Sequence, residues 1–259
     1  MNRSRRQILK AGCGLVTAAA LGRSAEPVVG LIYPQKSPVP AEALAMYPLG
    51  VKFLMGDVGL KTMTPEGYDS VIDHIVPAAK KLAKDGAQAV VLMGTSLSFY
   101  KGAAFNKSLA DSIHNATGLP ATTMSTGVVE GLRAVGGRRL AVATAYNEEV
   151  TERLRIFLKE SGFEVLAIKG LGLVRIGDPG KVSQQELDSF TVGVFKMAPK
   201  ADAMLVSCGG FRTLEMIAPL EKQCKVPVVS SLPHALWAGV RLVGLKGNAP
   251  GYGRLLSKA

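Results

Sequence analysis

The sequence is poor in the residues that mark several common protein classes. Its 259 residues include only three cysteines, one tryptophan and 6% aromatic residues, which argues against a disulfide-rich fold and against an aromatic nucleic-acid surface. No stretch approaches the roughly 20 apolar residues of a membrane-spanning helix, so no stable membrane anchor is expected. A hydrophobic content of 47% is enough for one large core or two modest ones.

Acidic residues are missing from the start of the chain, and this absence explains much of the net charge of +11. Beyond residue 25 the chain keeps 26 of its 31 basic residues against 20 acidic ones, an excess of about +6. That surplus is ordinary for a protein surface; it fits an anionic small-molecule substrate and does not indicate a nucleic-acid partner. The basic residues of the start are Arg3, Arg5, Arg6, Lys10 and Arg23.

Residues 1–25 are expected to be an export signal. Ser4 to Lys10 reads SRRQILK, which matches a twin-arginine motif, and the mildly apolar run from Ala11 to Leu21 follows it. We therefore expect the twin-arginine export machinery as a partner and a periplasmic mature protein, cleaved after Ala20 or Ala25. A basic amphipathic first helix is the alternative. Cleavage would remove Cys13 and leave two cysteines, which a helix over 213–221 would hold too far apart to bond.

Short β-branched runs alternate with longer helical patterns along the mature chain. Helices are indicated at 67–84, 147–161, 184–197 and 213–221, where apolar residues recur at three- and four-residue spacing. This alternation predicts an α/β fold with parallel sheets. The expected strands are 28–33, 51–54, 89–93, 121–124, 139–144, 164–168, 203–207 and 226–230.

Two segments of the chain resemble each other, which predicts two lobes. Residues 87–96 and 201–210 each run from a strand into a small polar cluster where a helix begins. We expect two similar lobes, 26–136 and 137–234, each a parallel four-stranded sheet flanked by helices, with a C-terminal helix 235–259 completing the first. Ligands of open α/β sheets bind beyond the carboxyl ends of the strands. The active site is therefore expected in the cleft between the lobes.

The two polar clusters carry candidate chemistry. Thr95, Ser96, Gly209 and Gly210 offer hydroxyls and backbone N–H groups that suit a carboxylate, although the same residues also serve as plain caps and turns. Cys208 is the only cysteine at such a strand end, which makes its thiol a catalytic candidate; the alternative is an inert buried cysteine.

Signals for cofactors are missing. His74, His114 and His234 stand apart from other ligand residues, so no metal is expected. Neither a G-x-G-x-x-G motif after a strand nor a phosphate loop occurs, so no nucleotide cofactor is expected. The residue spacing leaves a Ser/His/Asp triad open, but no G-x-S-x-G motif points to one.

Several motifs together resemble the arylmalonate decarboxylase family of the aspartate/glutamate racemase superfamily. The most specific is Met93 to Tyr100, MGTSLSFY, and the similarity extends from about Gly30 to Leu255. The resemblance implies a cofactor-independent decarboxylation of disubstituted arylmalonates to 2-aryl carboxylic acids. The other motifs are 122–126 (TTMST), 143–146 (ATAY), 207–210 (SCGG) and 250–255 (PGYGRL).

The resemblance also implies roles for individual residues. One substrate carboxylate would lie in a dioxyanion hole, and the other would be pressed into an apolar pocket where lost hydration favours its departure as CO₂. The Cys208 thiol would then protonate the enediolate that remains. The dioxyanion hole would comprise Gly94, Thr95, Ser96, Tyr146 and the backbone of Cys208 and Gly209; the pocket would comprise Leu60, Met63 and Leu97, with Pro34 at its edge.

Departures from the family leave two alternatives open. Racemases of the superfamily generally carry a second cysteine where this chain has Gly94, which implies a single proton donor and one product enantiomer. Gln35 stands where a second proline is expected, and residues 173–179 diverge from the family loop. The alternatives are a racemase or cis–trans isomerase with Tyr68 or Tyr146 as its base, and a non-catalytic periplasmic carboxylate-binding protein.

Overall fold

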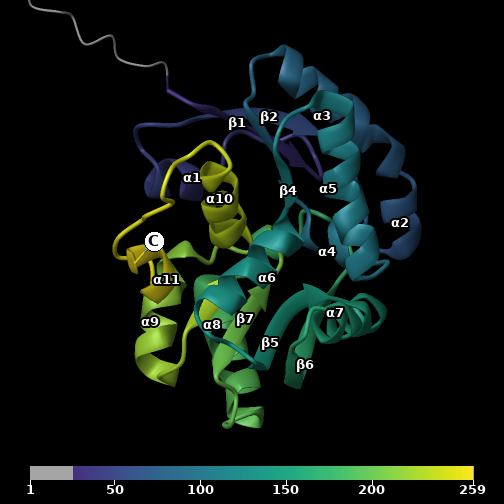
Figure 1. The fold of residues 1–259 in the computed structure, drawn as a ribbon. Helices are drawn as coiled ribbons and strands as arrows, with labels where there is room; N and C mark the ends of the chain where they lie inside the picture. The colour runs from purple at the N-terminus through teal and green to yellow at the C-terminus, as the bar shows by residue number, and fades with distance from the viewer. Residues whose placement is uncertain (1–25, 259) are drawn as a thin grey trace, which may run out of the picture.

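The computed structural model describes residues 26–258 and contains two parallel four-stranded sheets flanked by helices. The strand orders are β2-β1-β3-β4 in the first lobe and β6-β5-β7-β8 in the second. Figure 1 shows the two sheets stacked one above the other, with helices around each. This architecture confirms the expected α/β fold of two similar lobes. The expected signal peptide, 1–25, lies outside the described residues.

The strands form where buried aliphatic runs occur. All four side chains of β3 are buried, and β5 is buried from its second residue onward. Such continuous apolar runs are typical of parallel strands, because helices cover both faces of the sheet. The strands are β1 Val28–Tyr33, β2 Lys52–Asp57, β3 Ala89–Leu92, β4 Ala121–Thr123, β5 Arg139–Tyr146, β6 Glu164–Leu173, β7 Ala203–Ser207 and β8 Val228–Ser230.

Helix starts follow local capping chemistry. Thr64 precedes Pro65, the first residue of its helix, and the Thr64 side chain accepts a hydrogen bond from the Gly67 N–H. Ser183 and Glu186 form a capping box at the start of another helix. The α-helices are α1 Ala41–Met46, α2 Pro65–Asp69, α3 Ile75–Lys84, α4 Thr95–Phe99, α5 Ala103–Thr117, α6 Met124–Ala134, α7 Glu148–Glu160, α8 Gln184–Met197, α9 Leu214–Cys224, α10 Ser231–Arg241 and α11 Arg254–Lys258; the short 3₁₀ turns are η1 Ile72–His74 and η2 Pro179–Lys181.

The expected single helix over 67–84 is wrong. The chain forms α2, η1 and α3 instead. The Ser70 hydroxyl donates to the Gly67 carbonyl, and the Val71 N–H donates to the Tyr68 carbonyl, so the backbone tightens into a turn after α2. His74 Nδ1 then lies 3.0 Å from the Val58 carbonyl oxygen, which fixes the point where α3 starts.

The expected C-terminal helix over 235–259 is also wrong, because two separate helices occupy this region. Helix α10 begins at Ser231 and packs on α6, β3 and β4 of the first lobe, whereas α11 lies beside α9 of the second lobe (Figure 1). Glycines with positive φ, among them Gly244 and Gly253, interrupt the helix between them. The N–H of Arg254 donates to the Glu221 carboxylate of α9, which holds α11 there.

Several strand ends differ from expectation by a few residues. Strand β6 continues to Leu173, beyond the expected end at 168, because its ladder with β5 runs as far as Tyr146. Strand β8 begins at Val228 and is shorter than expected. Within residues 26–258 the structure contains no helix that combines the length and the apolar character needed to cross a membrane.

Candidate active site

One cavity lies where strand ends of both lobes meet. Its volume is about 160 Å³, and residues that end or follow β1, β3, β5 and β7 contribute to its walls. The carboxyl ends of parallel strands share one edge of a sheet, so both lobes present their loops to the same space. Every site residue expected from the sequence lines it: Pro34, Leu60, Met63, Gly94, Thr95, Ser96, Leu97, Tyr146, Cys208 and Gly209. The other lining residues are Tyr33, Gln35, Ser37, Met93, Ile176 and Gly210.

The Cys208 thiol is buried directly after β7. Its side chain is 5% exposed, and Sγ accepts a hydrogen bond from the Gly210 N–H at 3.4 Å. Burial raises the pKa of Cys208 to about 11, although the Gly210 N–H, the Tyr146 hydroxyl and the Phe211 N–H lower it in part. The group is therefore a neutral thiol at physiological pH. A protonated thiol is a proton donor, whereas a nucleophilic cysteine needs a lowered pKa.

Tyr146, at the end of β5, contributes a neutral hydroxyl beside the neutral thiol of Cys208. Burial is the main cause that raises its pKa well above the ordinary value, and the neighbouring ionisable groups Cys208 and Tyr68 add to the rise. The ring of Phe99 lies against the Tyr146 ring at a centroid distance of 5.7 Å, in an edge-on arrangement. The tyrosine hydroxyl therefore remains an O–H donor in the cavity across the physiological pH range.

Hydrogen bonds fix the backbone on which Thr95 and Ser96 stand. Helix α4 begins at Thr95, three residues after β3 ends. The carbonyl of Thr95 accepts hydrogen bonds from the hydroxyls of Ser98 at 3.0 Å and Ser125 at 2.9 Å. These bonds come from α4 itself and from α6, so the first turn of α4 is held from two sides. Both expected donors, Thr95 and Ser96, are buried within it.

Ser231, at the start of α10, links the two walls of the cavity. Its Oγ accepts hydrogen bonds from the Thr95 hydroxyl at 2.9 Å and from the Cys208 N–H at 3.1 Å. The Cys208 N–H is thus already engaged, which corrects the expectation that it serves as a free donor beside Gly209. Thr95 Oγ1 also lies 2.9 Å from Met124 Sδ, and a hydroxyl proton serves one acceptor at a time.

Sequence reasoning missed Ser231 and three lining residues, Tyr33, Ser37 and Met93. Ser231 directly follows β8, so the rule that sites lie beyond the carboxyl ends of strands offered a signal for it. Tyr33 and Met93 lie at or next to the ends of β1 and β3. Ser37 carried no signal, because only the folded loop brings it to the cavity.

The apolar wall comes mostly from the first lobe and is closed by the loop 173–179 of the second lobe. Leu60, Met63 and Leu97 are almost completely buried. The Met63 N–H donates to the Val174 carbonyl at 2.7 Å, and the Ile176 N–H donates to the Lys61 carbonyl at 3.1 Å. This pairing places Ile176 of the second lobe among the lining residues.

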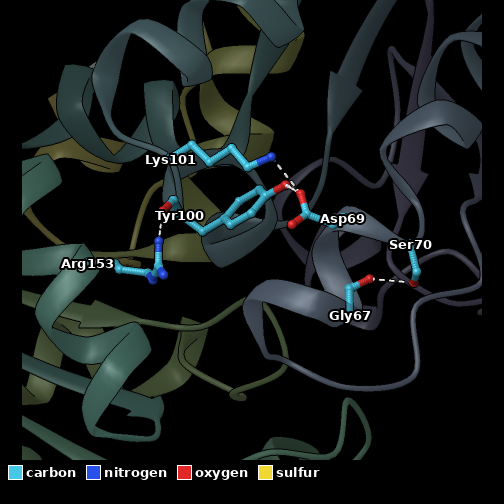
Figure 2. Close-up of polar contacts among 6 residues, drawn as sticks. All are labelled: Gly67, Asp69, Ser70, Tyr100, Lys101 and Arg153. Atoms are coloured by element: carbon cyan, nitrogen blue, oxygen red, sulfur yellow. Dashed lines mark hydrogen bonds and ion pairs between the residues drawn. The ribbon is translucent and has the colours of Figure 1, made fainter.

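A polar network outside the cavity holds α2 against the end of α4 (Figure 2). The Asp69 carboxylate accepts hydrogen bonds from the Tyr100 hydroxyl at 2.7 Å and from Lys101 Nζ at 2.6 Å. The lysine and the tyrosine, in that order, hold the pKa of Asp69 below its usual range. Arg153 of the second lobe donates to the Tyr100 carbonyl at 3.0 Å, so the network also joins the two lobes.

Cys208 and Cys224 are both free, as expected, and both are buried. Cys224 ends α9 and is not among the cavity residues. Among residues 26–258, no three His, Cys, Asp or Glu side chains lie together as a metal site would require. Burial lowers the pKa of His234 to about 4, so this imidazole is neutral and hydrogen-bonded to the backbone of Ser230.

The chain is similar in sequence to known proteins. The model of the family described as arylmalonate decarboxylase matches residues 29–256. A curated arylmalonate decarboxylase from Bordetella bronchiseptica is 46% identical over 92% of this chain and 99% of its own length. The chain belongs to the arylmalonate decarboxylase family. It is accordingly an enzyme of the carboxy-lyase class.

Solved structures agree with the family assignment. A doubly substituted arylmalonate decarboxylase in a liganded form superposes with a TM-score of 0.87 at 46% identity, and covers 90% of this chain and 100% of its own. A maleate isomerase from Pseudomonas putida S16, 22% identical, has the same fold with a TM-score of 0.82 over 90% of this chain and 98% of its own. The racemase-like fold thus extends beyond the decarboxylases.

Proposed function

We propose that this arylmalonate decarboxylase family member catalyses the cofactor-independent, enantioselective decarboxylation of disubstituted arylmalonates to 2-aryl carboxylic acids. The single observation that carries the proposal is a neutral, buried Cys208 thiol in a cavity that also contains hydroxyl donors and an apolar wall. The membership of the family supplies the substrate class.

In the proposed reaction the two carboxylates of the malonate meet different surroundings. One accepts hydrogen bonds from the hydroxyls of Ser96 and Tyr146 and from the Gly209 N–H. The Thr95 hydroxyl joins them when its proton turns from Ser231 to the substrate. The other faces Leu60, Met63 and Leu97, where loss of hydration favours departure as neutral CO₂. The carbon–carbon bond breaks, and its electron pair moves into an enediolate whose negative charge the donors stabilise.

Cys208 then completes the reaction as the proton donor. The thiol proton passes to the planar carbon, and solvent reprotonates the resulting thiolate. Gly94 lines the same cavity without a side chain that could supply a second proton. A single donor delivers the proton to one face, so one enantiomer is expected.

The racemase or isomerase alternative needs Tyr68 or Tyr146 as its base, and of these two only Tyr146 is among the residues that line the cavity. Burial is the main cause that raises the pKa of both phenols, so neither is an anion at neutral pH. The carboxylate-binding alternative gives no function to the Cys208 thiol, because anion binding requires hydroxyl and N–H donors and not a thiol. Both observations favour the decarboxylase.

The decisive experiment follows CO₂ release from phenylmalonate and from 2-methyl-2-phenylmalonate, with no added metal or organic cofactor. The proposal expects stoichiometric CO₂ and, from the second substrate, 2-phenylpropionate strongly enriched in one enantiomer. Binding without CO₂ release would favour the carboxylate-binding alternative. A racemic product that forms as fast as CO₂ would favour a two-base enzyme.

We propose, further, that the protein acts in the periplasm after export by the twin-arginine route. Support comes from the SRRQILK motif and the apolar run that follows it. Export of a folded protein suits an enzyme whose site needs both lobes in place.

A further inference from the structure

A carboxylate of the first lobe caps the helix that follows the Cys208 loop. Glu42, in α1, accepts hydrogen bonds from the N–H groups of Thr213 and Leu214. Both bonds are 3.0 Å long and end on the same oxygen, Oε1. Leu214 is the first residue of α9, and the Thr213 side chain at the N-cap position forms no capping hydrogen bond. Because a helix start leaves backbone N–H groups without partners, Glu42 supplies an acceptor that α9 lacks.

The loop between β7 and α9 carries groups on which the proposed reaction depends. It begins with Cys208, and the N–H groups of Gly209 and Gly210 follow. The Gly210 N–H donates to Cys208 Sγ at 3.4 Å, so the position of the loop backbone affects the thiol directly. Ser231 holds the start of this loop through the Cys208 N–H, and Glu42 holds its end.

The bonds from Glu42 cross from one lobe to the other. At the same end of the loop the Thr213 hydroxyl donates to Ser230 Oγ at 3.1 Å, and both of these residues belong to the second lobe. That bond stabilises the loop within its own lobe and does not set its place relative to Ser96 in the first lobe. The proposed reaction needs donors from both lobes around one substrate, so the contact across the lobes is the one that matters for the rate.

We propose that Glu42 is a positioning residue, which places the Cys208 loop against the donors of the first lobe through Thr213 and Leu214. The inference rests on the proposed function, since the expected change in rate concerns the decarboxylation. A displacement of reacting groups by about 1 Å can lower a rate by about a hundredfold. We expect a smaller loss, because Ser231 still holds the start of the loop when Glu42 is replaced.

Two substitutions separate the acceptor oxygen of Glu42 from its charge. Glu42→Gln removes the charge but keeps an Oε1 that accepts both bonds, so it should retain most of kcat for phenylmalonate. Glu42→Leu fills a similar space without an acceptor and should lower kcat about tenfold. The 2-phenylpropionate formed from 2-methyl-2-phenylmalonate should also lose enantiomeric excess, because the thiol no longer faces the planar carbon in a single orientation. Glu42→Ala repeats the test with a smaller side chain.

Glu160→Ala is the matched control. Glu160 ends α7 in the second lobe, and its Oε2 accepts a hydrogen bond at 2.7 Å from the N–H of Ala103, the first residue of α5 in the first lobe. It too is a carboxylate that caps a helix of the other lobe, but neither residue lines the cavity. Its removal should lower Tm, as Glu42→Leu does, while kcat and enantiomeric excess stay at the wild-type values.

Amide hydrogen exchange measures the order of the loop without turnover. Loss of an anchor allows local opening, which exposes backbone N–H groups to solvent. By NMR we expect the Cys208 and Gly210 N–H groups to exchange faster in Glu42→Leu and Glu42→Ala, and at the wild-type rate in Glu42→Gln and Glu160→Ala.

The outcomes separate the inference from the proposed function. Unchanged exchange at Cys208 and Gly210 overturns the positioning role, and so does an equal loss of kcat in Glu42→Leu and Glu160→Ala. A loss in Glu42→Gln as large as in Glu42→Leu also overturns it, because the charge and not the placed oxygen would then matter. If the wild-type protein releases no CO₂ from phenylmalonate, the proposed function fails, and the exchange rates alone decide whether Glu42 fixes the loop.

Discussion

Cys208 is a far stronger acid than a serine hydroxyl in the same place, and this difference predicts the effect of Cys208→Ser. We expect the variant to decarboxylate phenylmalonate more slowly by about a hundredfold or more, the usual contribution of a general acid. Cys224→Ser is the matched control, because this cysteine is also buried but lies outside the cavity. Initial rates of CO₂ release measure both. Equal losses in the two variants would remove the reason for assigning Cys208 as the donor.

The raised pKa of Cys208 predicts the alkaline behaviour of the enzyme. Its value of about 11 keeps the thiol protonated from neutral to moderately alkaline pH. As pH rises through the folded-state pKa the proton donor is lost, so activity should fall about tenfold per unit above pH 11. The pH dependence of kcat/KM measures this fall in activity. The rate of Cys208 alkylation by iodoacetamide should rise over the same pH range. A thiolate that forms near pH 7 would contradict this assignment.

Gly94 leaves the cavity with one proton donor, and Gly94→Cys should supply another. The residue has φ −142°, which any side chain tolerates, but an added Cβ would lie 3.0 Å from Leu97 Cβ. We therefore expect slower decarboxylation from crowding, together with measurable racemisation of 2-phenylpropionate by the new thiol. Gly94→Ala is the control, since it adds the same Cβ beside Leu97 without a thiol and should not racemise. Chiral chromatography decides; racemisation by the wild-type enzyme would reveal a second base.

Among the elements, the start of α10 has the clearest functional role, because Ser231 joins Thr95 to Cys208. Ser231→Ala should leave the buried Cys208 N–H unpaired, which costs about 1–3 kcal/mol of unfolding free energy. The shift of the donors should also lower kcat by about tenfold. Ser230→Ala is the control: its Oγ accepts from the Thr213 hydroxyl at 3.1 Å, so stability should fall while kcat holds. Denaturant unfolding and steady-state kinetics separate the two effects.

Element boundaries were predictable where a pattern was local and failed where the rest of the fold intervened. The strands Val28–Tyr33 and Ala203–Ser207 and the helix Gln184–Met197 match the sequence analysis residue for residue. Each is a run of buried side chains or an amphipathic stretch with its own cap. The helix expected over 67–84 broke because the Ser70 hydroxyl closes a turn and Val58 of another segment contacts His74. Periodicity alone carries no information on such contacts.

For the whole molecule, the export proposal makes a separate prediction. Replacement of Arg5 and Arg6 by lysine should hold the precursor in the cytoplasm, because the twin-arginine pair is the address that the export machinery reads. Arg23→Lys, a conservative change outside the motif, is the control and should be exported. Fractionation with antibody detection of the mature chain gives the readout. Normal export of the double variant would show that another signal directs the protein.

The two lobes hold one another through contacts between residues far apart in the sequence. Glu42 of α1 caps α9, and Arg153 of α7 donates to Tyr100 at the end of α4. The first contact is made to Thr213 and Leu214, which come shortly after Cys208 in the chain. The second contact belongs to the polar network of Figure 2. These bonds keep the two groups of strand ends facing one cavity.

The sequence by itself determined the α/β class, the two lobes and most of the residues of the cavity, because buried strands and polar strand ends are local patterns and because the MGTSLSFY motif is specific. Only the tertiary structure decided the raised pKa of Cys208 and the link through Ser231. These properties depend on which atoms exclude water and which donors find acceptors, and those neighbours come from distant parts of the chain.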